Sequence, residues 1–218
     1  MLHTQTIERK TLELLKALML DPQLGQFALV GGTALALYMG HRLSIDIDLF
    51  SPEPFDAPQM AKYMIDRYGF LTDMLEKNTL KGGIDDVKID LITHDYPTLR
   101  SYTVEDGIRL YSREDIAAMK LSAIADSGTR LKDFIDIAFL STLMSLNEMV
   151  AAYEKKYPNS NPVRTLKGLG YHDDIRFEEK IELLIGAYSW NAVRQRLTKM
   201  ARFPSIIFTD YPISLKEK

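Results

Sequence analysis

The sequence predicts an α+β fold, in which a small mixed sheet flanked by helices is followed by a mainly helical C-terminal region. Strand-like and helix-like apolar runs alternate between residues 25 and 92, and a double glycine separates the first strand-like run from the first short helix. After Ser112 the apolar residues recur at helical spacing. We therefore expect two parts, residues 1–111 with an N-terminal helix and a strand-rich core, and residues 112–218 with helices.

Composition and charge exclude several classes of protein. The chain has 218 residues with 46% hydrophobic content, enough for one compact domain or for a core domain with a helical appendage. It has no cysteine, which excludes disulfides and thiolate metal sites and fits a cytoplasmic location. The first 20 residues mix charged and apolar residues, so we expect no signal peptide, no bilayer span and no membrane partner. The net charge of −3 leaves nucleic-acid binding to a local patch.

The N-terminal third begins with helical spacing over residues 5–20, followed by an apolar strand from Phe27 to Val30. Gly31 and Gly32 predict a turn, and Thr33 opens a short apolar helix that closes at Gly40.

The next elements continue the alternation of strands and helices. Residues 41–50, "HRLSIDIDLF", predict a second strand, and Asp56 with Gln59 has capping-box spacing for a helix. Residues 70–96 predict two strands joined around Gly82 and Gly83, the second running from Val87 to Ile92.

The C-terminal part is predicted to be helical. Ser112 and Asp115 have capping-box spacing, and two helices are expected on either side of a break at residues 128–129, the second over residues 130–144. Residues 156–174 predict a polar connector, residues 177–202 further helices, and residues 205–208 a short apolar run.

Three aspartates on apolar strands are candidate metal ligands. Asp46 and Asp48 share one face of their predicted strand, with Ile45, Ile47 and Leu49 on the other face, and Asp90 lies in the later strand. Burying an unpaired carboxylate costs several kcal/mol, so a cation is expected nearby. Carboxylate oxygens suit Mg²⁺ or Mn²⁺ together with waters and substrate phosphates, which points to phosphoryl chemistry.

The glycine turn is a candidate phosphate site. Gly31 and Gly32 allow close approach of the backbone, the following helix directs free N–H groups outward, and Thr33 adds a hydroxyl. A triphosphate held there would face metal ions on Asp46 and Asp48, while Asp90 orients or deprotonates an attacking hydroxyl. Each feature alone has a plainer explanation, because a Gly-Gly-Thr turn is commonly only a turn and a D-x-D strand is commonly a solvated edge.

Together, "VGGTALALYMGHRLSIDIDLF", "VKIDLI" and "MKLSAIADSGTRLKDFIDI" resemble the AbiEii/AbiGii-type nucleotidyltransferase toxins of the DNA polymerase β-like superfamily. The resemblance covers about residues 25–140 and implies a nucleotidyltransferase-like fold. It assigns the nucleotide phosphates to Gly31, Gly32 and Thr33, the metal to Asp46, Asp48 and Asp90, and further catalytic roles to Lys120 and Asp133.

Several charged residues near these motifs have two interpretations. Lys120 neutralises a triphosphate if the resemblance holds, but is otherwise a surface lysine whose stem packs on the protein. Arg130, Asp133 and Asp136 share one helical face and are equally suited to simple ion pairing. We expect His41 and Arg42 either to contact phosphate or to pair with the aspartates. Arg42 is included among the predicted nucleotide-binding residues.

The resemblance implies transfer of an NMP from an NTP, with Mg²⁺, to an acceptor hydroxyl by the toxin of a toxin–antitoxin or abortive-infection pair. The expected acceptor is RNA, with tRNA foremost, and a cognate antitoxin is a possible partner. Residues 190–203, "WNAVRQRLTKMARF", offer a basic helical surface with Trp190 for RNA, although such runs are more commonly solvated helix faces. Two alternatives stay open: a small-molecule nucleotidyltransferase of the antibiotic-modifying kind, and a non-catalytic module that binds nucleotide or antitoxin.

Overall fold

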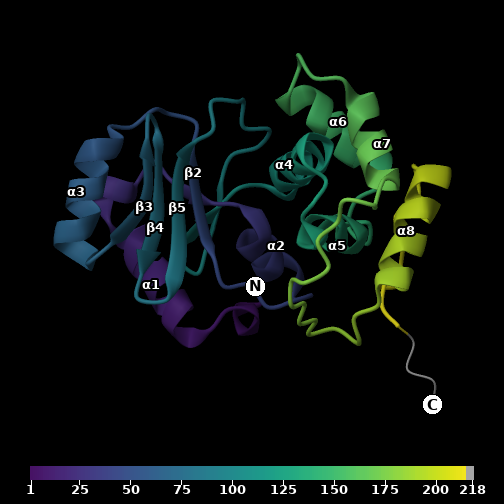
Figure 1. Ribbon diagram of the computed structural model, residues 1–218, viewed down its shortest axis with the longest axis horizontal. Coiled ribbons are helices and arrows are strands. Elements are labelled where there is room, and N and C mark those ends of the chain that lie inside the picture. The colour runs from purple at the N-terminus through teal and green to yellow at the C-terminus, as the bar shows by residue number, and fades with distance from the viewer. Residues whose placement is uncertain (215–218) are drawn as a thin grey trace. The chain divides into compact units, whose positions relative to one another are not determined.

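The computed structural model of the chain describes residues 1–214, which divide into two compact units (Figure 1). Unit 1 contains residues 1–40 and 44–111, and the described part of unit 2 contains residues 41–43 and 112–214. The short segment His41–Leu43 therefore belongs to unit 2, although the chain on both sides of it belongs to unit 1.

Unit 1 is built from a sheet and the helices around it. Its elements are η1 (Thr4–Thr6), α1 (Arg9–Leu20), η2 (Pro22–Leu24), β1 (Ala28–Leu29), α2 (Gly31–Met39), β2 (Ile47–Ser51), α3 (Ala57–Tyr68), β3 (Leu71–Glu76), β4 (Thr79–Ile84), β5 (Val87–Thr93), β6 (Thr103–Glu105) and β7 (Ile108–Leu110).

The sheet has seven strands in the order β3-β4-β5-β2-β1-β7-β6, and β3, β4, β5 and β2 lie side by side in Figure 1. The pairs β2–β5 and β1–β7 are parallel, while the other neighbouring pairs are antiparallel. The sheet is therefore mixed, and the predicted α+β fold is confirmed.

One face of the central strands forms the core of unit 1. Ile47 and Leu49 of β2 and Ile89 and Leu91 of β5 are buried, with Ile47 and Ile89 paired in register. The alternate residues of the same strands include Asp48 and Asp90. Because side chains alternate across a strand, burial of the isoleucines and leucines places the two aspartates together on the opposite face.

The turns in unit 1 differ from the sequence prediction. Residues 71–93 form three strands where two were predicted, because Gly82 and Gly83 lie inside β4 rather than in a turn. The chain reverses instead in two-residue loops that contain Asn78 and Asp85, whose φ values of 59° and 51° are left-handed. Asn and Asp tolerate this conformation better than other side chains do. The sequence prediction placed the turn at Gly82 and Gly83 and did not consider Asn78 and Asp85 as turn residues.

Other boundaries in unit 1 are also corrected. The helix α2 begins at Gly31 rather than Thr33, and β2 begins at Ile47, so Asp46 precedes the strand and Ile45 is 57% exposed. The β6–β7 hairpin was not predicted, although Asp106-Gly107 is a strong signal for such a turn. The predicted cap of α3 is confirmed, because the Asp56 carboxylate accepts from the Gln59 backbone N–H at 2.9 Å.

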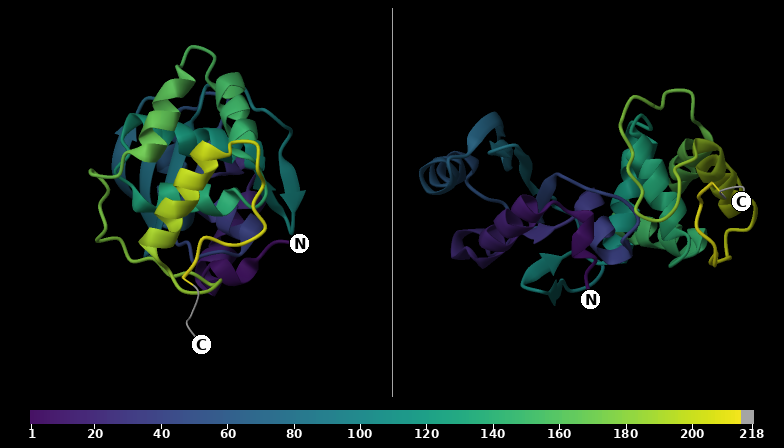
Figure 2. Two further views of the ribbon diagram at one scale, coloured as in Figure 1. Left: turned by 90° about the vertical axis from the view of Figure 1, so that its right-hand side faces the viewer. Right: turned by 90° about the horizontal axis from the view of Figure 1, so that it is seen from below.

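Unit 2 contains the helices α4 (Arg113–Asp126), α5 (Leu131–Leu140), α6 (Leu146–Lys156), α7 (Pro162–Gly170) and α8 (Trp190–Arg202). Helix α4 packs against α5, α6 and α7, and α8 packs against α5 and α7 at the surface of the unit (Figure 2). The Ser112 cap of α4 is confirmed, since its side chain accepts from the Asp115 backbone N–H at 3.0 Å. None of the helices in the described part of the chain has the length and apolar character needed to cross a bilayer.

Two predictions for unit 2 are wrong. The predicted polar connector contains α7, which Asn161 caps and Pro162 begins, so the polar residues mark a helix start rather than a loop. The helices predicted over residues 177–202 reduce to α8, and residues 177–189 contain only isolated bridges and turns.

Gly82→Ala tests the placement of Gly82 inside β4. A Cβ at this position would meet the Leu71 carbonyl oxygen and would lie 2.7 Å from the Phe70 ring. We expect a loss of about 3 kcal/mol in the free energy of unfolding, the upper end for overpacking. Gly170→Ala, where nothing lies within 4 Å, should change it by less than about 1 kcal/mol. Urea unfolding measures both variants, and equal losses would contradict the strand assignment.

Candidate functional site

The acidic site of unit 1 is built on the parallel pair β2–β5. Asp48 and Asp90 are direct partners in its register, so both carboxylates leave the same face of the sheet on adjacent strands. Asp48 is half-buried, and Asp90 is 7% exposed. Asp46 is half-buried just before β2. The three predicted aspartates therefore belong to one small region, but only Asp90 is buried.

The glycine turn lies directly against Asp48. The Val30 backbone N–H donates to the Asp48 carbonyl oxygen at 2.9 Å, and α2 begins at the next residue, Gly31. Gly31 has φ +71°, and a Cβ at this position would collide with Asp48 Oδ2 and lie 3.3 Å from Asp48 Cγ. Glycine is therefore required both by the backbone conformation and by the carboxylate beside it. The structure brings the start of α2 and the D-x-D aspartate together.

Thr33 connects the turn to the other aspartate. Its side chain is 1% exposed, and its hydroxyl contacts the Asp46 carbonyl oxygen and lies 2.8 Å from Ser44 Oγ. These contacts hold the backbone at Asp46 against the first turn of α2. The hydroxyl thus has a positioning role inside the protein, and direct contact of Thr33 with phosphate stays a prediction.

Asp90 has a cationic neighbour that the sequence interpretation missed. Lys81 of β4 is the register partner of Asp90, and its Nζ lies 3.0 Å from Asp90 Oδ2. Asp90 Oδ1 is buried and has no hydrogen-bond partner among the described residues. One oxygen of this carboxylate is paired and the other is an unused acceptor. The sequence did contain a signal for Lys81, because its position in β4 follows once the hairpin turns are placed correctly.

The donor set at this site fits a hard divalent cation. It offers carboxylate oxygens, the ligands that Mg²⁺ and Mn²⁺ favour, and it includes the unpaired buried Oδ1 of Asp90. Within residues 1–214 no three acidic or histidine side chains gather closely enough to form a complete ligand cluster. Mg²⁺ commonly uses one or two protein carboxylates and takes its other ligands from water and substrate phosphates. The carboxylates of Asp46, Asp48 and Asp90 are therefore the type of ligand that such an ion binds.

The other predicted site residues lie in unit 2, in a buried ionic cluster around Asp136. Arg42 Nε and Nη2 donate to the two oxygens of Asp136 at 2.7 and 2.9 Å, a bidentate pair. Lys120 Nζ lies 2.8 Å from Asp136 Oδ2 and 2.5 Å from Asp133 Oδ1. His41 Nε2 donates to Asp136 Oδ1 at 3.0 Å. Arg42, Lys120 and Asp133 therefore have internal partners, and their predicted roles toward the nucleotide stay predictions.

The electrostatics of the cluster follow from burial and mutual neutralisation. Burial alone would raise the pKa of Asp136, but Arg42 and Lys120 hold it well below its usual range. Burial alone would lower the pKa of Lys120, but Asp133 and Asp136 outweigh burial and raise it. Burial also dominates at His41, whose pKa is lowered despite the bond to Asp136, so the ring is neutral. Two cations thus balance two carboxylates in this cluster.

Among the described residues, the Arg130 side chain forms no hydrogen bond or ion pair with the residues of this cluster. It is the N-cap residue of α5 and forms an isolated backbone bridge with Arg176. Asp133 and Asp136 are ion-paired with Lys120, so the predicted ion pairing with Arg130 at a spacing of three residues on the same helix is not what the structure shows. Their partners come from another helix and from residues 41–42, not from Arg130 on the same helix.

The mixed sheet places the glycine-led start of α2 against Asp48 of β2, beside Asp90 of β5. The chain belongs to the AbiEii family, because residues 13–202 match the family described as nucleotidyl transferase AbiEii toxin, type IV TA system. The family resemblance that the sequence suggested is therefore confirmed.

The chain is also similar to one curated protein and to several solved structures. An uncharacterized protein of Aquifex aeolicus is 36% identical over 159 residues, which are 70% of this chain and 76% of that protein. Among solved structures, a proposed nucleotidyltransferase from Helicobacter pylori has a TM-score of 0.56 at 20% identity, over 90% of this chain and 95% of that one. The nucleotidyltransferase toxin MenT4 of Mycobacterium tuberculosis has a TM-score of 0.53 at 14% identity, over 82% and 75% of the two chains. The two structures share the fold with this chain.

Asp136→Asn tests the buried cluster. The substitution leaves Arg42 and Lys120 without the carboxylate that both contact, and breaking a buried ion pair from one side costs about 3–5 kcal/mol. We expect that loss in the free energy of urea unfolding. Asp126→Asn removes a carboxylate that is 65% exposed and pairs with Arg164 at 3.4 Å, so it should cost less than about 1 kcal/mol. Similar values for the two variants would contradict a stabilising cluster.

His41 makes stability depend on pH below neutrality. Its pKa is lowered in the folded state, so below the unfolded value of about 6.5 the unfolded chain binds a proton that the folded chain does not. The contribution of His41 to the free energy of unfolding is therefore fully present above about pH 6.5, the pKa of the unfolded state. It is lost as the pH falls below that pKa, by up to about 1.4 kcal/mol per pH unit. Unfolding free energies of wild type and His41→Gln between pH 7.5 and 5.0 measure the difference. Parallel curves for the two proteins would contradict this assignment.

Proposed function

We propose that the chain transfers an NMP from an NTP to a hydroxyl group of an RNA acceptor, with tRNA the first acceptor to test. The proposal includes dependence on Mg²⁺ or Mn²⁺ and action in the cytoplasm as the toxin of a type IV-like toxin–antitoxin or abortive-infection pair. The observation that carries it is the register pair of Asp48 and Asp90 with Gly31 packed against Asp48. The family description supports the toxin role and the possible cognate antitoxin.

The proposed reaction forms one bond and breaks one. The acceptor oxygen bonds to the α-phosphorus, the bond from that phosphorus to the bridging oxygen of the β-phosphate breaks, and pyrophosphate leaves. Asp48, Asp46 and Asp90 would hold the divalent cation, which supplies positive charge against the phosphates when it is bound. Asp90 would receive or orient the proton of the attacking hydroxyl only through an oxygen that the cation leaves free, and Oδ1 is the oxygen without a hydrogen-bond partner among the described residues.

The start of α2 would hold the triphosphate. The free backbone N–H groups of Gly31 and Gly32 and the positive end of the helix favour an anion, and Gly31 leaves no side chain between the backbone and Asp48. Thr33 fixes Asp46 through its backbone. Lys81 balances part of the negative charge at Asp90 before substrates bind.

Lys120, Asp133 and Arg42 enter the proposal in a different role from the one predicted. A direct contact of Lys120 with phosphate would require its ammonium group to leave two carboxylates at 2.5 and 2.8 Å. Arg42 would have to give up a bidentate pair with Asp136. Both exchanges cost a buried, hydrogen-bonded ion pair. We therefore infer that these residues chiefly stabilise unit 2, in which segment His41–Leu43 is anchored.

The proposal is tested by incubating the protein with each α-³²P-labelled NTP, MgCl₂ and total cellular RNA, followed by a denaturing gel. Asp48→Asn removes a carboxylate charge but keeps the side-chain volume. We expect the rate of nucleotide transfer to fall about 100-fold or more, as when one group that stabilises the charge of a transition state is removed. Asp73→Asn, an exposed carboxylate on β3, should transfer at the wild-type rate. EDTA should abolish transfer, and MnCl₂ should restore it.

Other outcomes separate the alternatives. Label on a small molecule seen by thin-layer chromatography, but not on RNA, would support a nucleotidyltransferase of the antibiotic-modifying kind. NTP binding without any labelled product would support the non-catalytic module. Equal transfer by wild type and Asp48→Asn would overturn the metal site.

A further inference from the structure

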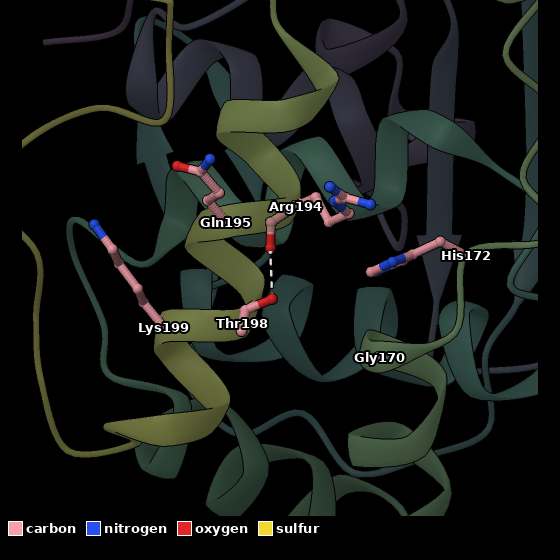
Figure 3. A pocket seen from close by; sticks show the side chains of 6 residues that line it. All are labelled: Gly170, His172, Arg194, Gln195, Thr198 and Lys199. Atoms are coloured by element: carbon pink, nitrogen blue, oxygen red, sulfur yellow. Dashed lines mark hydrogen bonds between the residues drawn. The ribbon is translucent and has the colours of Figure 1, made fainter.

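A basic hollow lies in unit 2 at the junction of α7 and α8 (Figure 3). Its volume is about 490 Å³, and its lining residues are Gly170, His172, Arg194, Gln195, Thr198 and Lys199. The lining contains two permanent cations and no carboxylate. A hollow of this composition favours an anionic ligand.

The cations of the hollow are available to a ligand. Arg194 contacts only the amide oxygen of Asn191 at 3.5 Å, and no carboxylate of the described residues pairs with Arg194 or Lys199. Both side chains are exposed. Arg196 on the same helix differs, because it is 4% exposed, pairs with Asp210 at 2.9 Å and lies 4.2 Å from the Phe208 ring centre. The basic surface predicted for this helix therefore excludes Arg196.

The floor of the hollow is held by aromatic packing. His172 Nε2 donates to the Leu169 carbonyl oxygen at 2.9 Å, and its ring meets Trp190 edge-on at 5.1 Å between centroids. Trp190 in turn packs edge-on against Phe134 and Phe177. Trp190 is half-buried, does not line the hollow, and packs against His172, which does.

The directions of the cations favour a strand over a single ion. In Figure 3 the Arg194 side chain extends toward His172, whereas Lys199 extends away from it on the other flank of α8. Two cations on different flanks of the helix are better suited to successive phosphates of a chain than to one phosphate group. Cations spaced along a backbone path are typical of single-stranded nucleic-acid binding.

We propose that the hollow lined by Arg194, His172, Thr198 and Lys199 binds the phosphodiester backbone of the RNA acceptor. This inference rests on the proposed function for the identity of the acceptor, but the site itself is separate from the acidic strands of unit 1. The neighbouring Asp173 and Asp174 do not line the hollow. Asp174, with a smaller effect of Asp173, raises the pKa of Tyr171. The negative charges of Asp173 and Asp174 would repel the phosphodiester backbone of the RNA from that side of the hollow.

The test compares two double variants of the full chain that lose the same charge. Arg194→Gln/Lys199→Gln removes the cations of the hollow, and Lys155→Gln/Lys180→Gln removes two exposed lysines outside it. Binding is measured by fluorescence anisotropy with a labelled 20-nucleotide single-stranded RNA across a KCl series. We expect the first variant to bind about tenfold more weakly and to reduce the slope of log Kd against log[KCl] by about 1.4, for two lost phosphate contacts. The second variant should bind like the wild type.

Further arms separate this inference from the proposed function. Asp48→Asn should bind the RNA normally while it fails to transfer nucleotide, and the hollow variant should bind a fluorescent ATP analogue like the wild type. Equal RNA binding by the two double variants, or no RNA binding by the wild type, would overturn the inference even if nucleotide transfer to another acceptor is observed. Loss of ATP-analogue binding without loss of RNA binding would also overturn it, since the hollow would then bind free nucleotide.

Discussion

The parallel register of β2 and β5 is the constraint on which unit 1 depends. It pairs Ile47 with Ile89 on the buried face and Asp48 with Asp90 on the other. A slip by one residue would exchange the two faces, so it would bury carboxylates and expose the core. Parallel neighbours need a long connection, and here α3, β3 and β4 supply it while adding Lys81 opposite Asp90. The hydrophobic core and the acidic site therefore specify the same register.

The two groups of charges in this chain are balanced in different ways. In the cluster of unit 2, Arg42 and Lys120 neutralise Asp133 and Asp136, and the buried Nδ1 of the neutral His41 ring is the cluster atom without a hydrogen-bond partner among the described residues. In unit 1 the aspartates outnumber the cation Lys81, and one buried oxygen of Asp90 has no hydrogen-bond partner among the described residues. A buried cluster whose charges are paired contributes to folding, whereas a buried carboxylate oxygen without a partner is an acceptor that a ligand could use.

Sequence reasoning succeeded where a local pattern determines the structure. The caps at Asp56 and Ser112 and the strand containing Asp90 follow from short-range chemistry. The separate turn predicted at Gly31 and Gly32 was wrong, because both glycines belong to the first turn of α2. Sequence reasoning also failed where left-handed Asn78 and Asp85 formed turns that glycine was expected to form, and where Asn161-Pro162 began a helix. The partners of Arg42 and Lys120 are far away along the chain, up to 94 residues from Arg42 to Asp136, and spacing alone does not give such pairs. The role of these residues was therefore the least predictable part of the site.

The charge distribution explains why RNA binding would need a surface of its own. The chain has a net charge of −3, so its overall field does not attract a polyanion, and the acidic strands repel one unless a cation is present. Attraction must come from a local group of cations without carboxylate partners, and Arg194 and Lys199 meet that condition, whereas Arg42, Lys120 and Arg196 do not. Counting basic residues along α8 would treat Arg194 and Arg196 alike. Their different partners, rather than their charge, determine which of them is available to a phosphate backbone.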